Sequence, residues 1–227
     1  MKLLGIETSS SLFSVAVSDG PVVLDYRQAD GQGSASTLLT DWVEAMLKKT
    51  GIPLSGLAGF AVSIGPGSFT GLRIGVMTVK TLAWSCKKPV LPVSSLEVIA
   101  HNLEKSPQPV VPFLDARKGN VYMACFIPDG RGGLQRSGPD ELLRPEEALK
   151  RFPEPAVLVG DGVKKYADLL RSAAPAGTDF ADPAQGIPRA DVLCRLAGSQ
   201  WPNGLMDDPH RLVPQYLYSQ ESDVAGS

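Results

Sequence analysis

The chain has 227 residues, 43% of them hydrophobic, which is enough for one large domain or two small ones and too apolar for a disordered protein. Lys and Arg number 22 against 24 for Asp and Glu, so the formal net charge is −2. This balance argues against a protein that binds nucleic acid through a broad cationic surface, and work on RNA would need a partner that supplies positive charge.

The three cysteines, Cys86, Cys125 and Cys194, lie far apart and form no Cys-x-x-Cys pair. Such a pattern argues against a disulfide framework and a thiolate zinc site, and it fits a reducing compartment. The N-terminus becomes polar after six residues, and no apolar run approaches the roughly 20 residues that cross a bilayer. We therefore expect a cytoplasmic protein with no signal peptide and no membrane segment.

The first part of the chain predicts an α/β lobe with a mixed sheet. Period-two alternation and tight turns indicate three antiparallel strands, and apolar spacing of three and four residues indicates helices further on. The order β-β-β-α-β-α-β-α is typical of the actin, hexokinase and Hsp70 superfamily and of ribonuclease-H-like lobes. The expected strands are 3–6, 13–18, 22–26, 60–64 and 89–93. The expected helices are one of about four turns that starts near Leu38 and is closed by Gly51, a second that carries Gly71 and Gly75 and ends near Lys87, and a short one over 96–103.

A second, smaller α/β lobe is predicted after the Pro-containing linker 104–109. We expect the first lobe to cover residues 1–104, which the C-terminal segment is able to complete, the second lobe 105–205, and a tail 206–227. The expected strands of the second lobe end at 115, 127 and 159; its helices begin near 145 and cover 163–173 and 189–200, with a loop at 179–188.

The stretch Gly65–Gly75 connects a strand to a helix and carries the most information. It is not a P-loop, because no Gly-Lys-Ser/Thr closes it, and a dinucleotide motif would need glycine where Thr70 stands. Two interpretations remain. The glycines let backbone N–H groups approach a phosphate at the helix N-terminus. Alternatively Gly67, Gly71 and Gly75, spaced by four, let another backbone pack closely.

The predicted helix that ends near Lys87 is apolar around most of its circumference, with Arg73 and Lys80 on a narrow polar stripe. Such a helix is covered on two sides, and its own sheet accounts for only one. The neighbouring helix or a second chain is able to cover the other side, and we favour a subunit interface. The expected interface residues are Leu38, Leu39, Trp42, Met46, Gly71, Ile74, Gly75 and Thr78.

Nucleophilic and metal catalysis find little support. His101 and His210 are the only histidines, and neither stands in a pairing motif with a Ser or Cys nucleophile. Glu97 and His101 have the i, i+4 spacing of two metal ligands, but no His-Glu-x-x-His frames them, and a solvated helix face is the simpler interpretation. We predict no catalytic residue and no metal site.

Polar residues at the ends of several predicted strands suggest the hypothesis of a nucleotide cleft. Glu7 ends the first strand, Asp115 and Arg117 end a strand of the second lobe, and Gly160-Asp161-Gly162 follows another. Turn chemistry explains all three without a ligand. The candidate cleft residues are Glu7, Thr8, Ser9, Gly65, Gly67, Asp115 and Arg117.

Several blocks along the chain resemble the TsaB (YeaZ) family of tRNA threonylcarbamoyladenosine biosynthesis. They are Leu4–Ser9, Gly65–Gly75, Val93–Glu97, Asp115–Lys118 with Val121-Tyr122, and Pro214–Leu217. The resemblance implies a two-lobed actin-like fold and a subunit that is not itself the catalyst. In this family the transferase TsaD modifies the adenosine beside the anticodon of tRNAs that read codons beginning with A.

The resemblance also implies the partners. TsaB binds and activates TsaD through the helices of its first lobe, TsaE joins the assembly, tRNA is met through the complex, and a homodimer forms when TsaD is absent. This chain needs no cofactor of its own, whereas the complex uses ATP and Mg²⁺. The His-x-x-x-His metal motif of the catalytic subunits is missing from the sequence.

The sequence departs from the family pattern at Glu7, commonly Asp, at Gly33–Ser36, where His-Ser or His-Thr is usual, and at Tyr218, which replaces an Arg. A rival hypothesis is a stand-alone actin-fold phosphotransferase or ATPase that uses Glu7 and Asp115. A peptidase is a third, and the missing metal pair argues against it.

Overall fold

The computed structural model describes residues 1–30, 35–152, 155–201 and 208–218. The chain divides into two compact units. The first unit comprises residues 1–98 and 187–214, and the second comprises 99–186 and 215–227. The boundaries differ from the expected lobes 1–104 and 105–205 and tail 206–227, because the first part ends at residue 98 and the chain returns to the first unit at residue 187. That return agrees with the expectation that the C-terminal segment completes the first lobe.

The sheet of the first unit has the order β3-β2-β1-β4-β5. The first three strands form an antiparallel meander, and β4 and β5 add in parallel to the other side of β1. The predicted element order of this unit is confirmed. Its strands are β1 (Lys2–Glu7), β2 (Leu12–Asp19), β3 (Val22–Asp30), β4 (Gly59–Gly65) and β5 (Val90–Ser94).

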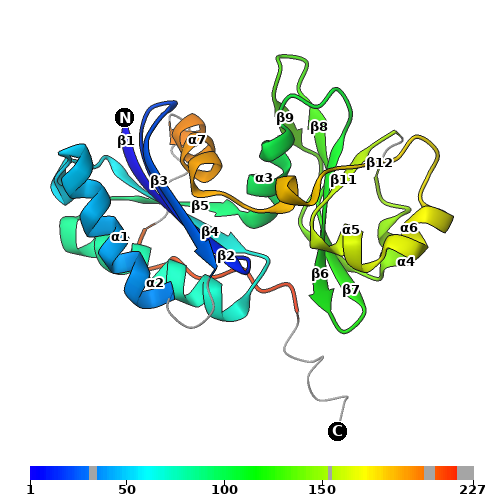
Figure 1. The fold of residues 1–227 in the computed structure, drawn as a ribbon, viewed down its shortest axis with the longest axis horizontal. Coiled ribbons are helices and arrows are strands. Elements are labelled where there is room, and N and C mark those ends of the chain that lie inside the picture. Colours follow the sequence, from blue (N-terminus) through cyan, green and yellow to red (C-terminus); the bar gives the residue numbers. More distant parts are fainter. Residues whose placement is uncertain (31–34, 153–154, 202–207, 219–227) are drawn as a thin grey trace, which may run out of the picture. The chain divides into compact units, whose positions relative to one another are not determined.

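Helices cover both faces of this sheet (Figure 1). On one face α1 (Ala35–Thr50) and α2 (Phe69–Cys86) bury a core with the inward side chains of β1, β2 and β4. On the other face α7 (Ala190–Gln200) buries a second core. Gly5 of β1 permits this contact, because a Cβ there would lie 2.6 Å from the Cys194 sulfur. The shorter elements are η1 (Leu54–Gly56) and α3 (Ser95–Ala100).

The second unit has a seven-stranded sheet whose main path runs β10-β7-β6-β11-β12, with β8 paired to β6 and β9. Three helices, α4 (Pro145–Ala148), α5 (Asp161–Lys165) and α6 (Ala167–Ala173), accompany this sheet (Figure 1). Residues of α4, α6 and the sheet share one buried core. The strands are β6 (Val110–Arg117), β7 (Asn120–Met123), β8 (Phe126–Pro128), β9 (Leu134–Arg136), β10 (Glu141–Leu143), β11 (Val157–Val159) and β12 (Asp179–Phe180); η2 (His101–Leu103) and η3 (Pro183–Gly186) complete the unit.

Three expectations for the second unit need correction. The single strand expected to end at 127 is two strands, because β7 pairs with β10 and β6 while β8 pairs with β9 and the start of β6. The helix expected over 163–173 is divided at Tyr166, which lies outside the helical region of backbone space. The expected loop 179–188 includes a two-residue strand, β12.

Each unit therefore carries a mixed sheet with helices, the α/β class expected from the sequence. In the part of the chain that the structure describes, every helix is too short or too polar to span a membrane.

Candidate functional site

The carboxyl group of Glu7, at the end of β1, lies in the interior of the first unit. Its Oε1 accepts a hydrogen bond from the Ser9 N–H at 2.7 Å, and its Oε2 accepts one from the Ser63 hydroxyl on β4. Burial raises the pKa of Glu7, and the hydrogen bonds from Ser63 and Ser9 offset this only in part. Both oxygens are thus committed to the fold.

The turn after Glu7 receives the start of α2. Ser68 is the N-cap of the helix: its Oγ accepts from the Gly71 N–H at 3.2 Å, which satisfies one of the free donors of the first turn. The Ser68 N–H donates to the Ser9 carbonyl oxygen at 2.7 Å. The helix N-terminus is therefore attached to the β1–β2 connection.

The three glycines spaced by four make this attachment possible. A Cβ at Gly71 would overlap the carbonyl oxygen of Thr8, one at Gly75 would overlap the Thr8 hydroxyl, and one at Gly67 would overlap the Ser9 carbonyl. Of the two interpretations open from the sequence, close packing accounts for all three positions. The backbone that approaches is the chain's own.

Some of the expected interface residues face this interior. Leu39 and Met46 are fully buried in the core between α1 and the sheet, and Gly75 is buried against Thr8. The expectation that these three residues contact a partner is therefore corrected, because a partner has no access to them in this fold. Trp42 is partly buried, and its ring stacks on Phe13 with centroids 5.0 Å apart.

The remaining expected interface residues, Leu38, Gly71, Ile74 and Thr78, are half-buried. Leu38 and Ile74 pack against the edge of the same core. The Thr78 hydroxyl donates to the Ile74 carbonyl at 2.8 Å, within the helix. These residues retain partial exposure and stay candidates for a contact surface.

The outer side of α2 carries large exposed apolar side chains that were not among the interface residues expected from the sequence. Phe69, Met77 and Trp84 are 53%, 59% and 64% exposed, and the Arg73 guanidinium lies 3.8 Å from the centroid of the Phe69 ring. Spacings of four, four and seven place these four residues on one side of the helix. We call them the α2 face. Their spacing was visible in the sequence, but the narrow polar stripe of Arg73 and Lys80 was too weak a signal to orient a helix that is otherwise largely apolar.

The C-terminal segment of the first unit packs beside this helix. The Lys80 ammonium donates to the carbonyl oxygens of His210 at 3.1 Å and Leu212 at 3.2 Å, and Leu212 is buried in the core. Val213, the next residue, is 65% exposed. These two hydrogen bonds of Lys80 hold the C-terminal segment on α2.

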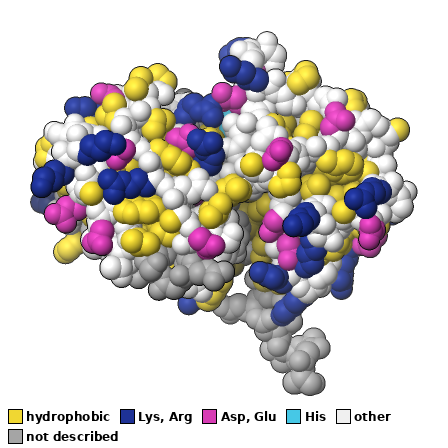
Figure 2. Space-filling model, viewed as in Figure 1, with side chains coloured by type: hydrophobic (Ala, Val, Ile, Leu, Met, Phe, Trp, Pro, Cys, Tyr) yellow, Lys and Arg dark blue, Asp and Glu magenta, His cyan; other side chains and the backbone are white. Residues whose placement is uncertain are grey.

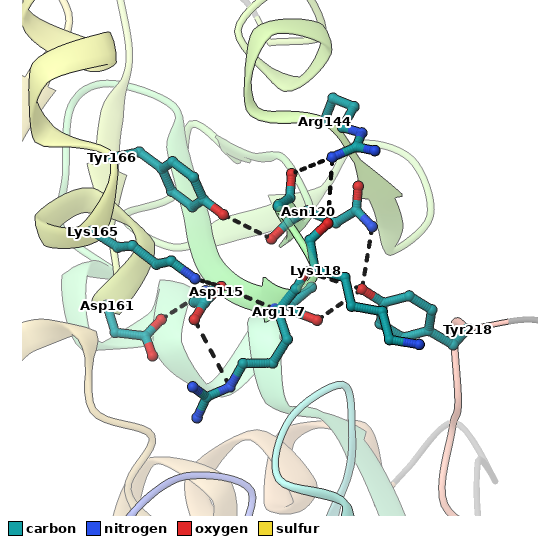
Figure 3. A network of polar contacts seen from close by, with 11 residues as sticks. Asp115, Arg117, Lys118, Asn120, Arg144, Asp161, Lys165, Tyr166 and Tyr218 are labelled. Atoms are coloured by element: carbon teal, nitrogen blue, oxygen red, sulfur yellow. Dashed lines mark hydrogen bonds and ion pairs between the residues drawn. The ribbon is translucent and has the colours of Figure 1, made fainter. Parts of the chain in front are cut away.

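The other candidate cleft residues, Asp115 and Arg117, belong to the second unit. The Asp115 Oδ1 accepts from the Lys165 ammonium at 2.7 Å and from the Arg117 N–H at 2.9 Å, while the Asp115 N–H donates to Asp161 at 2.9 Å (Figure 3). Burial raises the pKa of Asp115, but these hydrogen bonds outweigh it, and the pKa lies below its ordinary value of 3.8. Asp161, the central residue of the Gly160–Gly162 turn, thus orders the end of β6.

The metal and cysteine interpretations gain nothing from the structure. The Glu97 Oε1 accepts from the Gln200 side-chain amide at 3.1 Å, and the His101 ring lies edge-on to Phe126. No group of three His, Cys, Asp or Glu side chains in the described ranges is arranged to hold a metal ion. Cys86, Cys125 and Cys194 are free thiols, and burial raises the pKa of Cys194 to about 12.

Comparison with known proteins identifies the family. Residues 34–217 match the family model described as "TsaD: tRNA N6-adenosine threonylcarbamoyltransferase". The chain is 30% identical to the tRNA threonylcarbamoyladenosine biosynthesis protein TsaB of Bacillus subtilis over 99% of this chain and 97% of that protein.

Solved structures agree with this match. YeaZ from Pseudomonas aeruginosa superimposes with a TM-score of 0.82 at 28% identity, over 95% of this chain and 99% of that one. A putative N-acetylmannosamine kinase from Listeria monocytogenes, 12% identical with a TM-score of 0.54 over 89% of this chain and 100% of that one, shares the actin-like fold. The chain therefore belongs to the family that the TsaD model describes and, within it, to the TsaB (YeaZ) proteins of tRNA threonylcarbamoyladenosine biosynthesis.

Proposed function

We propose that this chain is the non-catalytic subunit that binds the transferase TsaD and holds it in its active state while N6-threonylcarbamoyladenosine is formed beside the anticodon of tRNAs that read codons beginning with A. TsaE joins this assembly. The chain shifts the conformational equilibrium of TsaD toward its active state. This requires only that the chain binds the active state of TsaD more tightly than the inactive one. The observation that carries the proposal is the α2 face.

The α2 face has the composition of an interface core. Aromatic residues, Met and Arg are enriched in protein–protein interfaces, and a few such residues supply most of the binding free energy. Scattered exposed apolar side chains are normal on a monomer, but Phe69, Met77 and Trp84 lie in one row on one helix. The half-buried Leu38, Ile74 and Thr78 are available to extend this row. The same face supports self-pairing when TsaD is absent.

The strand-end carboxylates weigh against the rival phosphotransferase or ATPase. A carboxylate that orients a nucleotide-bound Mg²⁺ must offer an oxygen to the ligand, whereas Glu7 is fully buried and its oxygens accept hydrogen bonds from Ser9 and Ser63. Asp115 is engaged by Lys165 and by the Arg117 N–H. We therefore propose that ATP and Mg²⁺ are used by the complex and not by this chain.

The test replaces exposed side chains of the α2 face. Met77→Glu and Trp84→Ala should weaken binding to purified TsaD by about 30-fold each if these are hot spots of the interface. The formation of modified tRNA in a mixture reconstituted with TsaD and TsaE should fall in parallel. Phe180→Ala removes an aromatic ring that is 46% exposed on the second unit and should change neither quantity.

Two results would count against the proposal: full tRNA modification without this chain, or TsaD binding by both α2 variants at the wild-type level. Steady ATP turnover by the pure chain that is lost in Glu7→Ala would favour the rival. A bulky residue at Gly75 is unsuitable as a probe of the interface, because its Cβ would overlap Thr8 and disturb the fold itself.

A further inference from the structure

The turn between β6 and β7 carries a cluster of basic side chains that the α2 face does not use. We propose that this turn, residues 115–120 with the side chains around it, binds the phosphate backbone of an RNA. The identification of that RNA as the tRNA modified by the complex rests on the proposed function; the binding chemistry does not. We call this surface the β6–β7 tip.

Positive charge is concentrated here although the chain as a whole carries −2. Lys and Arg side chains gather around the ends of β6 and β7 in the second unit (Figure 2). Two carboxylates lie among the labelled residues, Asp115 and Asp161, and each accepts a hydrogen bond within the network (Figure 3). The cations at the tip and on α5 are Arg117, Lys118, Arg144, Lys164 and Lys165.

The network keeps its charge in the neutral pH range. The hydrogen bond to Asp115 raises the pKa of Lys165, so this ammonium stays protonated. Arg117 has 87% of its side chain exposed, and its Nε lies 3.9 Å from the Asp115 Oδ2. A guanidinium has five N–H donors in a planar fork that matches the oxygens of a phosphate. Arg117 therefore has the exposure and the donor geometry for a backbone contact.

The backbone of the tip adopts an unusual conformation. Arg117, Lys118 and Gly119 have φ values of 65°, 49° and 74°, three consecutive residues in the left-handed region. For a residue other than glycine this conformation costs roughly 1–2 kcal/mol. In a turn that only connects two strands, Gly or Asn adopts this conformation more easily than Arg or Lys. Two long cationic residues here indicate a role for their side chains.

Side chains from elsewhere in the unit hold this conformation. The Tyr218 hydroxyl lies 2.9 Å from the Ala116 carbonyl oxygen and 3.1 Å from that of Arg117, within donating distance of both. The Arg144 guanidinium donates to the carbonyl oxygens of Lys118 and Gly119, each at 3.3 Å (Figure 3). The tip is therefore fixed from two sides, which lowers the entropy cost of a contact made by its side chains.

RNA fits this surface better than an acidic protein does. The Lys118 ammonium lies 5.9 Å from the Tyr218 ring centroid, and Tyr216 in the same segment is 46% exposed. Cations beside tyrosines are the usual composition of surfaces that bind RNA, where phosphates meet Lys or Arg and unpaired bases stack on aromatic rings. A protein interface needs an apolar core. Residues 115–120 carry no exposed large apolar side chain of the kind that α2 carries.

The test measures binding of a fluorescein-labelled, unmodified tRNA transcript to the full chain, alone and in complex with TsaD, from about 50 to 200 mM salt. The double variant Arg117→Gln/Lys118→Gln should bind roughly tenfold more weakly at the lowest salt, and its salt slope should fall by about 1.4–1.8, the loss expected for two phosphate contacts. The control Lys105→Gln/Arg131→Gln removes the same charge from exposed positions of the second unit outside the tip and should leave both quantities unchanged.

The outcomes separate the two proposals. Equal affinity and equal salt slope for wild type and tip variant, or no RNA binding by the wild-type chain in either setting, would overturn the inference. So would a tip variant that loses TsaD but keeps its RNA affinity, because the tip would then contact the protein. A wild-type chain that does not bind TsaD, with RNA binding that still depends on Arg117 and Lys118, would sink the proposed function and leave the inference standing.

Discussion

The two units place a carboxylate in the same topological position and treat it in opposite ways. Glu7 lies at the end of β1 and Asp115 near the end of β6, and each strand is central in its sheet, with an antiparallel neighbour on one side and a parallel neighbour on the other. Glu7 is fully buried and its pKa is raised, whereas Asp115 keeps 11% of its side chain exposed and its pKa is lowered. The same plan thus yields a sealed strand end and an open one.

The difference arises from the helix that follows the parallel neighbour. In the first unit β4 leads into α2, whose glycines let the helix close over Thr8 and Ser9. In the second unit β11 leads into the short α5, which ends in Lys165 and reaches Asp115 with an ammonium group. Small residues seal one strand end, and a partly exposed lysine pairs with the carboxylate at the other.

The largest effect is expected from Gly71→Ala, which tests the seal directly. The added Cβ would overlap the backbone oxygen of Thr8, which cannot move without displacing the β1–β2 turn. We expect a loss of about 3 kcal/mol in the free energy of unfolding, measured by urea denaturation, because overpacking against backbone is poorly relieved.

Gly198→Ala in α7 is the matched control. The nearest atom to a Cβ there is the Leu3 Cδ1 at 3.9 Å, an ordinary contact, so the change should stabilise the chain by about 0.5–1 kcal/mol through helix propensity alone. Similar unfolding midpoints for the two variants would contradict a tight seal of Gly71 against Thr8.

The next effect separates the two carboxylates by pH. The raised pKa of Glu7 means that the folded protein holds this proton above 4.5, the ordinary value at which the unfolded chain releases it, so ionisation costs stability as pH rises. Glu7→Gln keeps the shape and one acceptor oxygen, and its amide group cannot ionise. Its stability relative to wild type should therefore increase from about pH 4 to pH 7 in urea titrations.

Asp115→Asn should show the opposite sign. Because the pKa of Asp115 lies below 3.8, its charge contributes stability that is present above that pH and is lost as the pH falls through the lower, folded-state value. The variant should thus be less stable than wild type near neutrality, and the two should converge in acid. Parallel pH profiles for the Glu7 and Asp115 variants would contradict the contrast between the strand ends.

Local patterns in the sequence predicted the elements of the first unit well. Period-two alternation in β2 is a strong signal because large apolar side chains face the α1–α2 core and small residues face α7, and the spacing of Leu39, Val43 and Met46 in α1 is one because that helix has one buried side. The short strands β8, β9 and β10 have three residues each, too few to show an alternation, so their pairing depends on contacts that the sequence does not display.

The site was harder to predict than the fold for a related reason. The spacing of Gly67, Gly71 and Gly75 indicated a close approach, but the identity of the approaching backbone, Thr8 and Ser9, is a tertiary fact. Burial of Leu39 and Met46 rather than Met77 and Trp84 likewise depends on the rotation of each helix about its axis. Apolar residues around most of α2 leave that rotation poorly determined until the sheet is in place.

The smallest effect is expected from Lys165→Met, which removes the ammonium from Asp115 and keeps the length of the side chain. The ion pair is exposed on the lysine side, with 44% of that side chain accessible, so water and salt screen it strongly. The urea midpoint should fall slightly at low ionic strength, and the difference from wild type should vanish in about 1 M salt. Lys164→Met, one residue earlier on α5, removes the same charge from an exposed side chain that is not hydrogen-bonded to Asp115, and it should leave the midpoint unchanged. A loss in Lys165→Met that persists at high salt would mean that Asp115 is held as tightly as Glu7, and that the open strand end of the second unit is closed by its lysine much as the first is closed by its glycines.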